Sequence, residues 1–143
     1  MEVSFYLSAG AILISISSLT WSIHIGRRDR GKLKATSKFY QPAPGYGSPY
    51  LKVKAVNHGR RPVILTMLGS DFSDGSSSTM VLKNHALRLG ENEAYEEDLR
   101  VADGCTMTEE GEEAIDLWFE DTLGRRHKVE NAKENLRKLL GKD

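Results

Sequence analysis

The chain opens with an uninterrupted apolar segment. Residues Val3–Ile25 run for 23 positions without Asp, Glu, Lys or Arg, and a helix of that length spans about 34 Å at roughly 1.5 Å per residue. The hydrocarbon core of a bilayer is about 30 Å thick. Phe5, Tyr6 and Trp21 lie near the two ends, where aromatic side chains meet the membrane interfaces. The pattern predicts a single transmembrane helix within residues 1–26.

A basic juxtamembrane segment, residues 27–31, follows this span. An excess of Lys and Arg beside a span marks the cytoplasmic side, so we predict an inner-membrane, single-pass protein with the N-terminus outside and the C-terminal domain in the cytoplasm. A cleaved signal peptide is the alternative, but it requires a basic start and a small-residue cleavage site, whereas this chain starts Met-Glu-Val-Ser. The side chains expected to bind lipid headgroups are Arg27, Arg28, Arg30 and Lys32.

Small residues recur along one face of the predicted span, at intervals that alternate between four and three positions. In lipid, helices associate through small residues that allow close approach and through modest hydroxyl hydrogen bonds. We therefore expect this stripe to pack against a second copy of the chain or against another membrane protein. The alternative is that each hydroxyl bonds a carbonyl within its own helix. The stripe comprises Ser4, Ser8, Ala11, Ser15, Ser18 and Ser22.

Beyond residue 32 the pattern changes to short runs in which apolar and polar residues alternate. Leu51, Val53 and Ala55 share one face of such a run, and the runs are separated by turn-forming segments such as 41–49. Period two is typical of half-buried strands. About seven short strands predict an all-β domain over residues 32–130, with an Ig-like antiparallel β-sandwich as the economical architecture and a small open barrel as the alternative.

The last segment, residues 131–143, returns to helical periodicity. Asn131 followed by Glu134 resembles a capping box at the start of a short C-terminal amphipathic helix. Its apolar face either covers the β domain or docks on a partner or on the membrane surface. That face comprises Ala132, Leu136, Leu139 and Leu140.

Charge is strongly segregated although the total is zero. Residues 26–61 hold ten bases and one acid, whereas residues 91–121 hold thirteen acids and one base. Attraction to lipid headgroups explains a basic block beside a span, so we expect no nucleic-acid partner. Most acidic runs are solvated loops; the alternative is a partner-binding acidic patch. That patch comprises Glu109, Glu110, Glu112 and Glu113.

The sequence offers little reactive chemistry. Cys105 is the single cysteine, so neither a disulfide within the chain nor a Cys-rich zinc site can form. The four histidines lie in different segments, and no phosphate-binding, dinucleotide-binding or nucleophile-elbow motif is present. We therefore expect no catalytic residues, no metal and no cofactor.

Three short motifs accompany the anchor and the alternating runs. They are Asn57-His-Gly59 before a Pro62-Val strand, Leu89-Gly90-Glu91, and Asp121-Thr-Leu-Gly124-Arg125. On these motifs the chain resembles a widespread, largely uncharacterised group of small bacterial and phage membrane-anchored proteins with Ig-like β-sandwich domains. The resemblance spans most of the chain and implies a fold and an anchor. It transfers no catalytic or binding residues.

Taken together, these features predict a non-enzymatic, membrane-anchored protein-interaction module, a subunit or adaptor of a membrane-associated assembly. One alternative is a phage- or prophage-type membrane factor, for example in superinfection exclusion. A second alternative is a ligand-binding domain whose site is assembled only in the fold.

Overall fold

The computed structural model describes residues 2–82, 86–101, 108–109 and 112–141. The chain divides into two compact units, one ending at Arg30 and the other beginning at Gly31. The first unit contains the helix α1 (Glu2–Arg28), and the second contains all described strands and the short helix α2 (Ala132–Leu139). Each unit is considered by itself below.

The helix α1 is long and apolar enough to cross a membrane. Its apolar stretch Tyr6–Gly26 covers 21 residues with a mean hydropathy of 1.4, and none of that stretch is buried. Large side chains such as Leu13, Ile14 and Trp21 are exposed around the helix. Full exposure of so many apolar groups would be unfavourable in water and is favourable in lipid. The predicted N-terminal apolar helix is confirmed.

The second unit is built on one sheet, in which most strands lie close to the runs predicted from alternation. The strand order is β4-β3-β8-β9-β1-β2-β6, with β5 also paired to β3 and β7 paired to β8. Every pairing is antiparallel except that of β1 with β9, which is parallel. The strands are β1 (Leu33–Tyr40), β2 (Tyr50–Asn57), β3 (Val63–Phe72), β4 (Ser77–Val81), β5 (Leu87–Leu89), β6 (Ala94–Leu99), β7 (Thr108–Glu109), β8 (Glu112–Asp121) and β9 (Arg126–Glu130).

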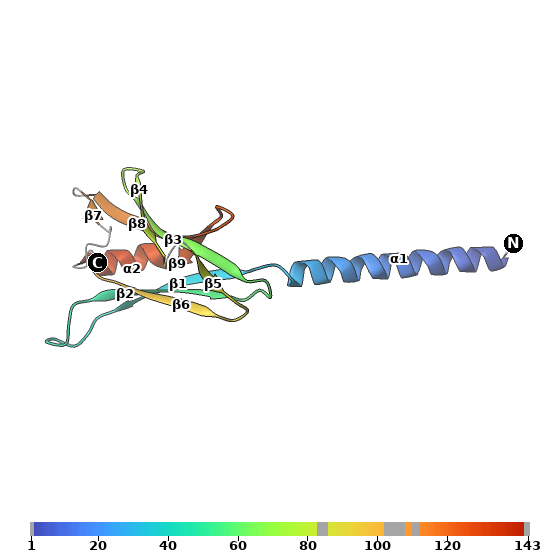
Figure 1. Ribbon diagram of the computed structural model, residues 1–143, viewed down its shortest axis with the longest axis horizontal. Helices are drawn as coiled ribbons and strands as arrows, with labels where there is room; N and C mark the ends of the chain where they lie inside the picture. The colour runs from blue at the N-terminus through green and yellow to red at the C-terminus, as the bar shows by residue number, and fades with distance from the viewer. Residues whose placement is uncertain (1, 83–85, 102–107, 110–111, 142–143) are drawn as a thin grey trace. The chain divides into compact units, whose positions relative to one another are not determined.

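This sheet is mixed and curled into a half-barrel, so the predicted β-rich class is confirmed but the Ig-like sandwich is not. The parallel pairing of Ala35 with Val129 and of Thr36 with Glu130 joins the first and last strands at the centre of the sheet. The path of hydrogen-bonded strands is therefore continuous rather than divided into two facing sheets (Figure 1). Alternation specifies which side chains face inward, but it carries no information on which strands pair.

The inner face of the half-barrel forms the hydrophobic core. Leu51, Val53 and Ala55 are fully buried, as their alternation predicts, and Phe119 packs from β8 on the opposite wall. Each large apolar side chain removed from water contributes on the order of 2 kcal/mol of transfer free energy. Burial along one face of each strand therefore fixes which face of the sheet turns inward.

Trp118 is also buried, although it lies on the outer face of the sheet. Its side chain is only 2% exposed because the indole lies across Gly69, its cross-strand partner, where a Cβ atom would collide with the ring. The Arg126 guanidinium carbon lies 3.9 Å from the ring centroid on the exposed side. The indole nitrogen donates a hydrogen bond of 2.9 Å to Asp71. Burial of Trp118 therefore depends on the glycine opposite it.

The helix α2 covers the concave side of the curled sheet and follows β9 directly. It contacts β1, β2 and β8 (Figure 1), with Ala132, Leu136 and Leu139 buried. The apolar face therefore covers the β domain, in agreement with the first of the two alternatives. Asn135 ties the helix to β1, because its side-chain amide donates to the carbonyl (3.1 Å) and hydroxyl (3.0 Å) oxygens of Ser37.

The predicted capping box at the start of α2 is wrong. Asn131 occupies the N-cap position in a left-handed conformation (φ 61°) and makes no side-chain capping hydrogen bond. Glu134 instead accepts a 2.7 Å ion pair from Lys138, one turn later on the same helix. The left-handed residue turns the chain from β9 into α2 within a single position, a conformation that Asn tolerates better than most residues.

A buried asparagine holds one end of the sheet together. Asn57 is fully buried at the end of β2, and the side chain uses all its hydrogen-bonding capacity. Its amide donates to three carbonyl oxygens and its oxygen accepts from two backbone N–H groups. The acceptors are those of Arg61 (2.8 Å), Leu89 (3.1 Å) and Gly90 (3.1 Å), and the donors are those of Lys32 (3.3 Å) and Gly59 (2.9 Å).

The chain entering β1 is packed against the same end of the sheet. At Gly31 an added Cβ atom would lie 2.8 Å from the Val63 side chain and 3.2 Å from the Arg61 carbonyl oxygen. Asn57 also bonds through its backbone, donating to the Glu93 carbonyl and accepting from the Asn92 N–H. Two turns and the start of β1 therefore meet around one residue.

We expect Asn57→Asp to lower the free energy of unfolding by roughly 3 kcal/mol. The substitution places an anionic oxygen against three carbonyl oxygens in a site without water access. Urea unfolding of the full chain in detergent measures the change, followed by fluorescence in a Trp21→Phe background so that Trp118 is the single tryptophan. Asn92→Asp is the matched control, because Asn92 is exposed and surface changes alter stability by about 0.5 kcal/mol or less. Equal unfolding midpoints for the two variants would show that Asn57 does not hold the sheet end.

Candidate functional site

The predicted small-residue stripe lies along α1. Ser8, Ala11, Ser15, Ser18 and Ser22 are exposed, and the side chain of Ser4 is outside the described set. The Ser15 hydroxyl donates a 2.9 Å hydrogen bond to the Ala11 carbonyl oxygen within the same helix. Such a bond satisfies the hydroxyl and leaves the narrow face of small side chains unchanged.

Of the predicted headgroup-binding residues, Arg30 and Lys32 are exposed. Arg27 and Arg28 lie in the last turn of α1, and their side chains are outside the described set. The Lys32 backbone N–H donates to the Asn57 side chain, whereas the Lys32 side chain is exposed at the surface.

The predicted acidic patch lies at the β7–β8 hairpin. Glu109 pairs with Glu112 across this hairpin through the backbone, and Glu113 is partly buried on β8. Glu110 lies outside the described residues, as do Cys105 and His85. Three of the four glutamates, Glu109, Glu112 and Glu113, therefore belong to the described part of this hairpin.

Metal-ligating residues do not gather in the part of the chain that the structure describes. Within those residues no group of three His, Cys, Asp or Glu side chains is placed to hold a metal ion. His24 lies on α1, His58 lies exposed after β2, and His127 lies on β9.

His127 belongs instead to a polar network that closes the β8–β9 turn around Asp121. The carboxylate is 3% exposed and accepts hydrogen bonds from the backbone N–H groups of Leu123 (2.9 Å) and Arg125 (3.0 Å). The Arg125 Nε (2.9 Å) and the His127 Nε2 (3.0 Å) contact its second oxygen. Burial alone would raise the pKa of Asp121, but these hydrogen bonds together outweigh burial and lower it. The Asp-x-x-Gly-Arg motif is therefore the sequence of a turn that Asp121 holds through hydrogen bonds to Leu123 and Arg125.

The outer face of β1, β2 and β6 carries a ladder of charges across three strands. Lys54 lies 2.8 Å from Glu96, and Lys52 lies 3.5 Å from both Glu96 and Asp98. The negative charge of Asp98, more than any other neighbour, raises the pKa of Lys52. The register places Lys52 opposite Asp98 and Lys54 opposite Glu96, an arrangement of opposite charges that stabilises neighbouring strands.

On β1, this ladder is not balanced. Lys38 lies directly opposite Lys52, and like charges in that position are unfavourable. Among the described residues Lys38 forms no ion pair; its ammonium group lies 5.2 Å from the Tyr40 ring centroid. The Tyr40 and Tyr50 rings are stacked with centroids 5.2 Å apart, and the Arg100 guanidinium lies 5.5 Å from the Tyr50 ring.

We call this surface the tyrosine–lysine face. Part of it lines a depression of about 240 Å³, whose walls are formed by Thr36, Ser37, Lys38, Tyr40, Lys52, Lys54 and Glu96. Tyr and Arg are enriched at the energetic centres of protein interfaces, where they combine apolar area with polar reach. The face comprises Lys38, Tyr40, Tyr50, Lys52 and Arg100.

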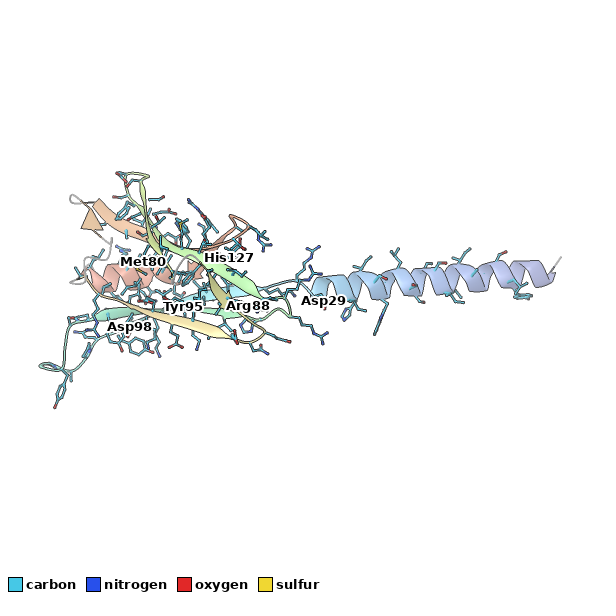
Figure 2. The ribbon with its side chains drawn as sticks, in the orientation of Figure 1. Asp29, Met80, Arg88, Tyr95, Asp98 and His127 are labelled. Carbon is cyan, nitrogen blue, oxygen red and sulfur yellow. The ribbon has the colours of Figure 1, made fainter. Side chains whose placement is uncertain are left out.

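A second polar feature lies on the inner face of β6. Tyr95 and Glu97 lie opposite Ala55 and Val53, both of which face the core. Figure 2 labels Tyr95 on β6. Its hydroxyl donates to the Glu97 carboxylate, and its ring packs edge-on against Phe119, with the ring centroids 6.4 Å apart. Burial, followed by the hydrogen bond and the charge of Glu97, raises the pKa of Tyr95. An inward-pointing charge on an edge strand also protects that edge from pairing with other chains.

The alternation of apolar and polar residues does not by itself reveal the tyrosine–lysine face. Tyr40 and Tyr50 directly flank the predicted turn segment 41–49, so treating the two runs as a hairpin would have placed the rings opposite each other. Arg100 follows β6, and its position beside Tyr50 depends on the pairing of β6 with β2. Alternation along a single strand contains no signal for that pairing.

Comparison with known proteins does not assign the chain to a family. No protein-family model matches the chain, and no curated protein matches it. Among solved structures, the chain is similar to an X-ray structure of Northeast Structural Genomics Consortium target SoR45, at 8% sequence identity and a TM-score of 0.32. That match covers 71% of this chain and 82% of the other.

Proposed function

We propose that this chain is a non-enzymatic, membrane-anchored protein-interaction module. The observation that carries the proposal is the tyrosine–lysine face. Its Tyr40 and Tyr50 rings are stacked, and each ring has a cation beside it: Lys38 beside Tyr40 and Arg100 beside Tyr50. Lys38 lacks an ion-pair partner among the described residues and faces Lys52. An acidic partner surface would relieve this like-charge contact, and the tyrosines would supply apolar contact area.

We propose that the anchor holds the β unit at the cytoplasmic side of the inner membrane. The excess of arginines directly after α1 supports this orientation. The motif resemblance supports a bacterial or phage origin. In this arrangement the module acts as a subunit or adaptor of a membrane-associated assembly, with lipid and protein as its partners.

We expect a fluorescent protein fused to the C-terminus to be fluorescent in a bacterial host, and alkaline phosphatase fused at the same position to be inactive. The basic flank holds the C-terminal side in the cytoplasm, where phosphatase does not fold into an active form. A variant with Arg27, Arg28 and Arg30 replaced by Ser is the control, because it loses the charge bias and should give mixed signals. High phosphatase activity from the unchanged chain would contradict the orientation.

We expect a photo-crosslinking amino acid at Lys38 to give a discrete adduct in cells and one at Lys128 to give none. Both lysines are exposed, but Lys128 lies on β9, away from the tyrosine–lysine face, and pairs with Asp116 at 3.3 Å. Reversing the charge at Lys52 should reduce the Lys38 adduct several-fold if the partner is acidic. Equal labelling from both positions would show that the face has no dedicated partner.

We also propose that the small-residue stripe of α1 packs against a second helix, either another copy or a membrane partner. Its support is the continuous exposure of small side chains from Ser8 to Ser22, which allows two helix backbones to approach closely.

We expect Ser15→Leu/Ser22→Leu to lower self-association in a membrane two-hybrid assay, because leucine separates the two helix backbones. Ser17→Leu/Thr20→Leu is the matched control. Both control hydroxyls bond their own helix, at 2.9 Å and 2.8 Å, but they lie off the stripe. Similar losses from both pairs would attribute the effect to hydroxyl removal. No loss from the stripe pair would remove homo-oligomers from the proposal.

A further inference from the structure

We infer that the β unit carries a second membrane contact, formed by the turns at the end of the sheet where the chain enters from α1. This rim would bind an anionic lipid surface through basic side chains and one exposed leucine. The inference rests on the proposed membrane anchor and deepens it, since it assigns a lipid-binding role to the folded domain. The rim comprises residues 31–32, 58–62, 90–93 and 122–125.

The length of the tether limits how far this rim can lie from the bilayer. The helix α1 ends at Arg28, and Gly31 is packed against Val63 and the Arg61 carbonyl. Only Asp29 and Arg30 intervene, so the Cα atoms of Arg28 and Gly31 are at most about 11 Å apart. That limit is comparable to the Debye length of about 8 Å at physiological ionic strength. The short tether therefore joins the β unit to the anchor at this rim.

Hydrogen bonds show that the four rim segments lie at one end of the sheet. Asn57 joins Lys32 to the turns at 58–62 and 90–93, as described above. The Thr122 N–H donates to the Ile64 carbonyl at 3.0 Å, which places the β8–β9 turn beside the start of β3. The parallel pairing of Ala35 with Val129 puts the first residues of β9 level with Lys32.

The rim combines basic charge with an exposed apolar tip. Leu123 is 73% exposed at the tip of the β8–β9 turn, and it is held there by the Asp121 hydrogen bonds rather than by packing. The rim holds four bases and two exposed acids, and one of the bases, Arg125, is paired with Asp121 at 2.9 Å. Each base near an anionic surface contributes about 1 kcal/mol, and a leucine that enters the interface adds apolar burial. The bases are Lys32, Arg60, Arg61 and Arg125, and the acids are Glu91 and Glu93.

The opposite end of the sheet provides an internal reference. The β1–β2 loop carries Tyr46, which is 84% exposed. It is separated from the rim by the eight residues of β1, about 27 Å of strand. A probe at this position reports an exposed apolar loop residue at the end of the sheet opposite the rim.

The test uses the full chain, with Cys105→Ser, reconstituted into phosphatidylcholine vesicles with or without phosphatidylglycerol. An environment-sensitive fluorophore is attached at Leu123→Cys or at Tyr46→Cys. We expect the fluorophore at position 123 to shift to the blue and to become several-fold less accessible to acrylamide in the anionic vesicles. High salt should weaken the effect. The fluorophore at position 46 should remain accessible in both lipids.

Charge variants identify the source of the contact. Arg60→Ser/Arg61→Ser should restore acrylamide access at position 123, whereas Lys133→Ser/Arg137→Ser removes two exposed bases from α2 and should not. Equal accessibility at positions 123 and 46 in anionic vesicles would overturn the inference. Flotation with the vesicles and resistance to alkaline extraction test the anchor separately. A chain that floats but shows an accessible position 123 keeps its anchor and loses only the rim contact.

Discussion

The fold depends on the buried side chain of Asn57. Curling a sheet into a half-barrel brings several turns together at one end, and each turn exposes backbone donors and acceptors to a space without water. One amide satisfies five of these groups at once. An apolar residue of the same size would leave them unpaired, at a cost of about 1–3 kcal/mol for each group. The same side chain accepts a hydrogen bond from the Lys32 N–H. It therefore fixes both the start of β1 and the turns at this end of the sheet.

The parallel pairing of β1 with β9 has a second consequence. It places the chain's last strand at the centre of the sheet, and α2 follows from Asn131 directly onto the concave side. The inner faces of β1, β2 and β8 are thereby covered, while the outer faces of β1, β2 and β6 remain open to solvent with their charges and tyrosines. The outer face and the rim thus remain exposed, whereas the helix α2 covers the inner face.

Sequence patterning accounted well for single elements and poorly for their assembly. The inward face of β2 was predicted correctly, because Leu51, Val53 and Ala55 lie at alternate positions along the strand. Trp118 alternates with Asp116 and Glu120 on the outer face of β8, yet it is buried because Gly69 lies opposite. The role proposed for Asn131 as a side-chain cap failed because backbone conformation, not residue type, decides which hydrogen bonds a capping residue makes. The stacking of Tyr40 on Tyr50 required a register that one strand cannot specify.

By itself, the sequence determined the apolar helix, the basic segment after it, the positions of most strands and the apolar face of α2. Each of these follows from the order of side chains along a few turns or one strand, where spacing alone sets the exposed and buried faces. Only the tertiary structure decided that the strands form one mixed, curled sheet, that Asn57 and Asp121 are buried hubs, and that the tyrosine–lysine face and the rim exist. These features join residues that are far apart in the chain, and their geometry arises from pairing and packing rather than from local periodicity.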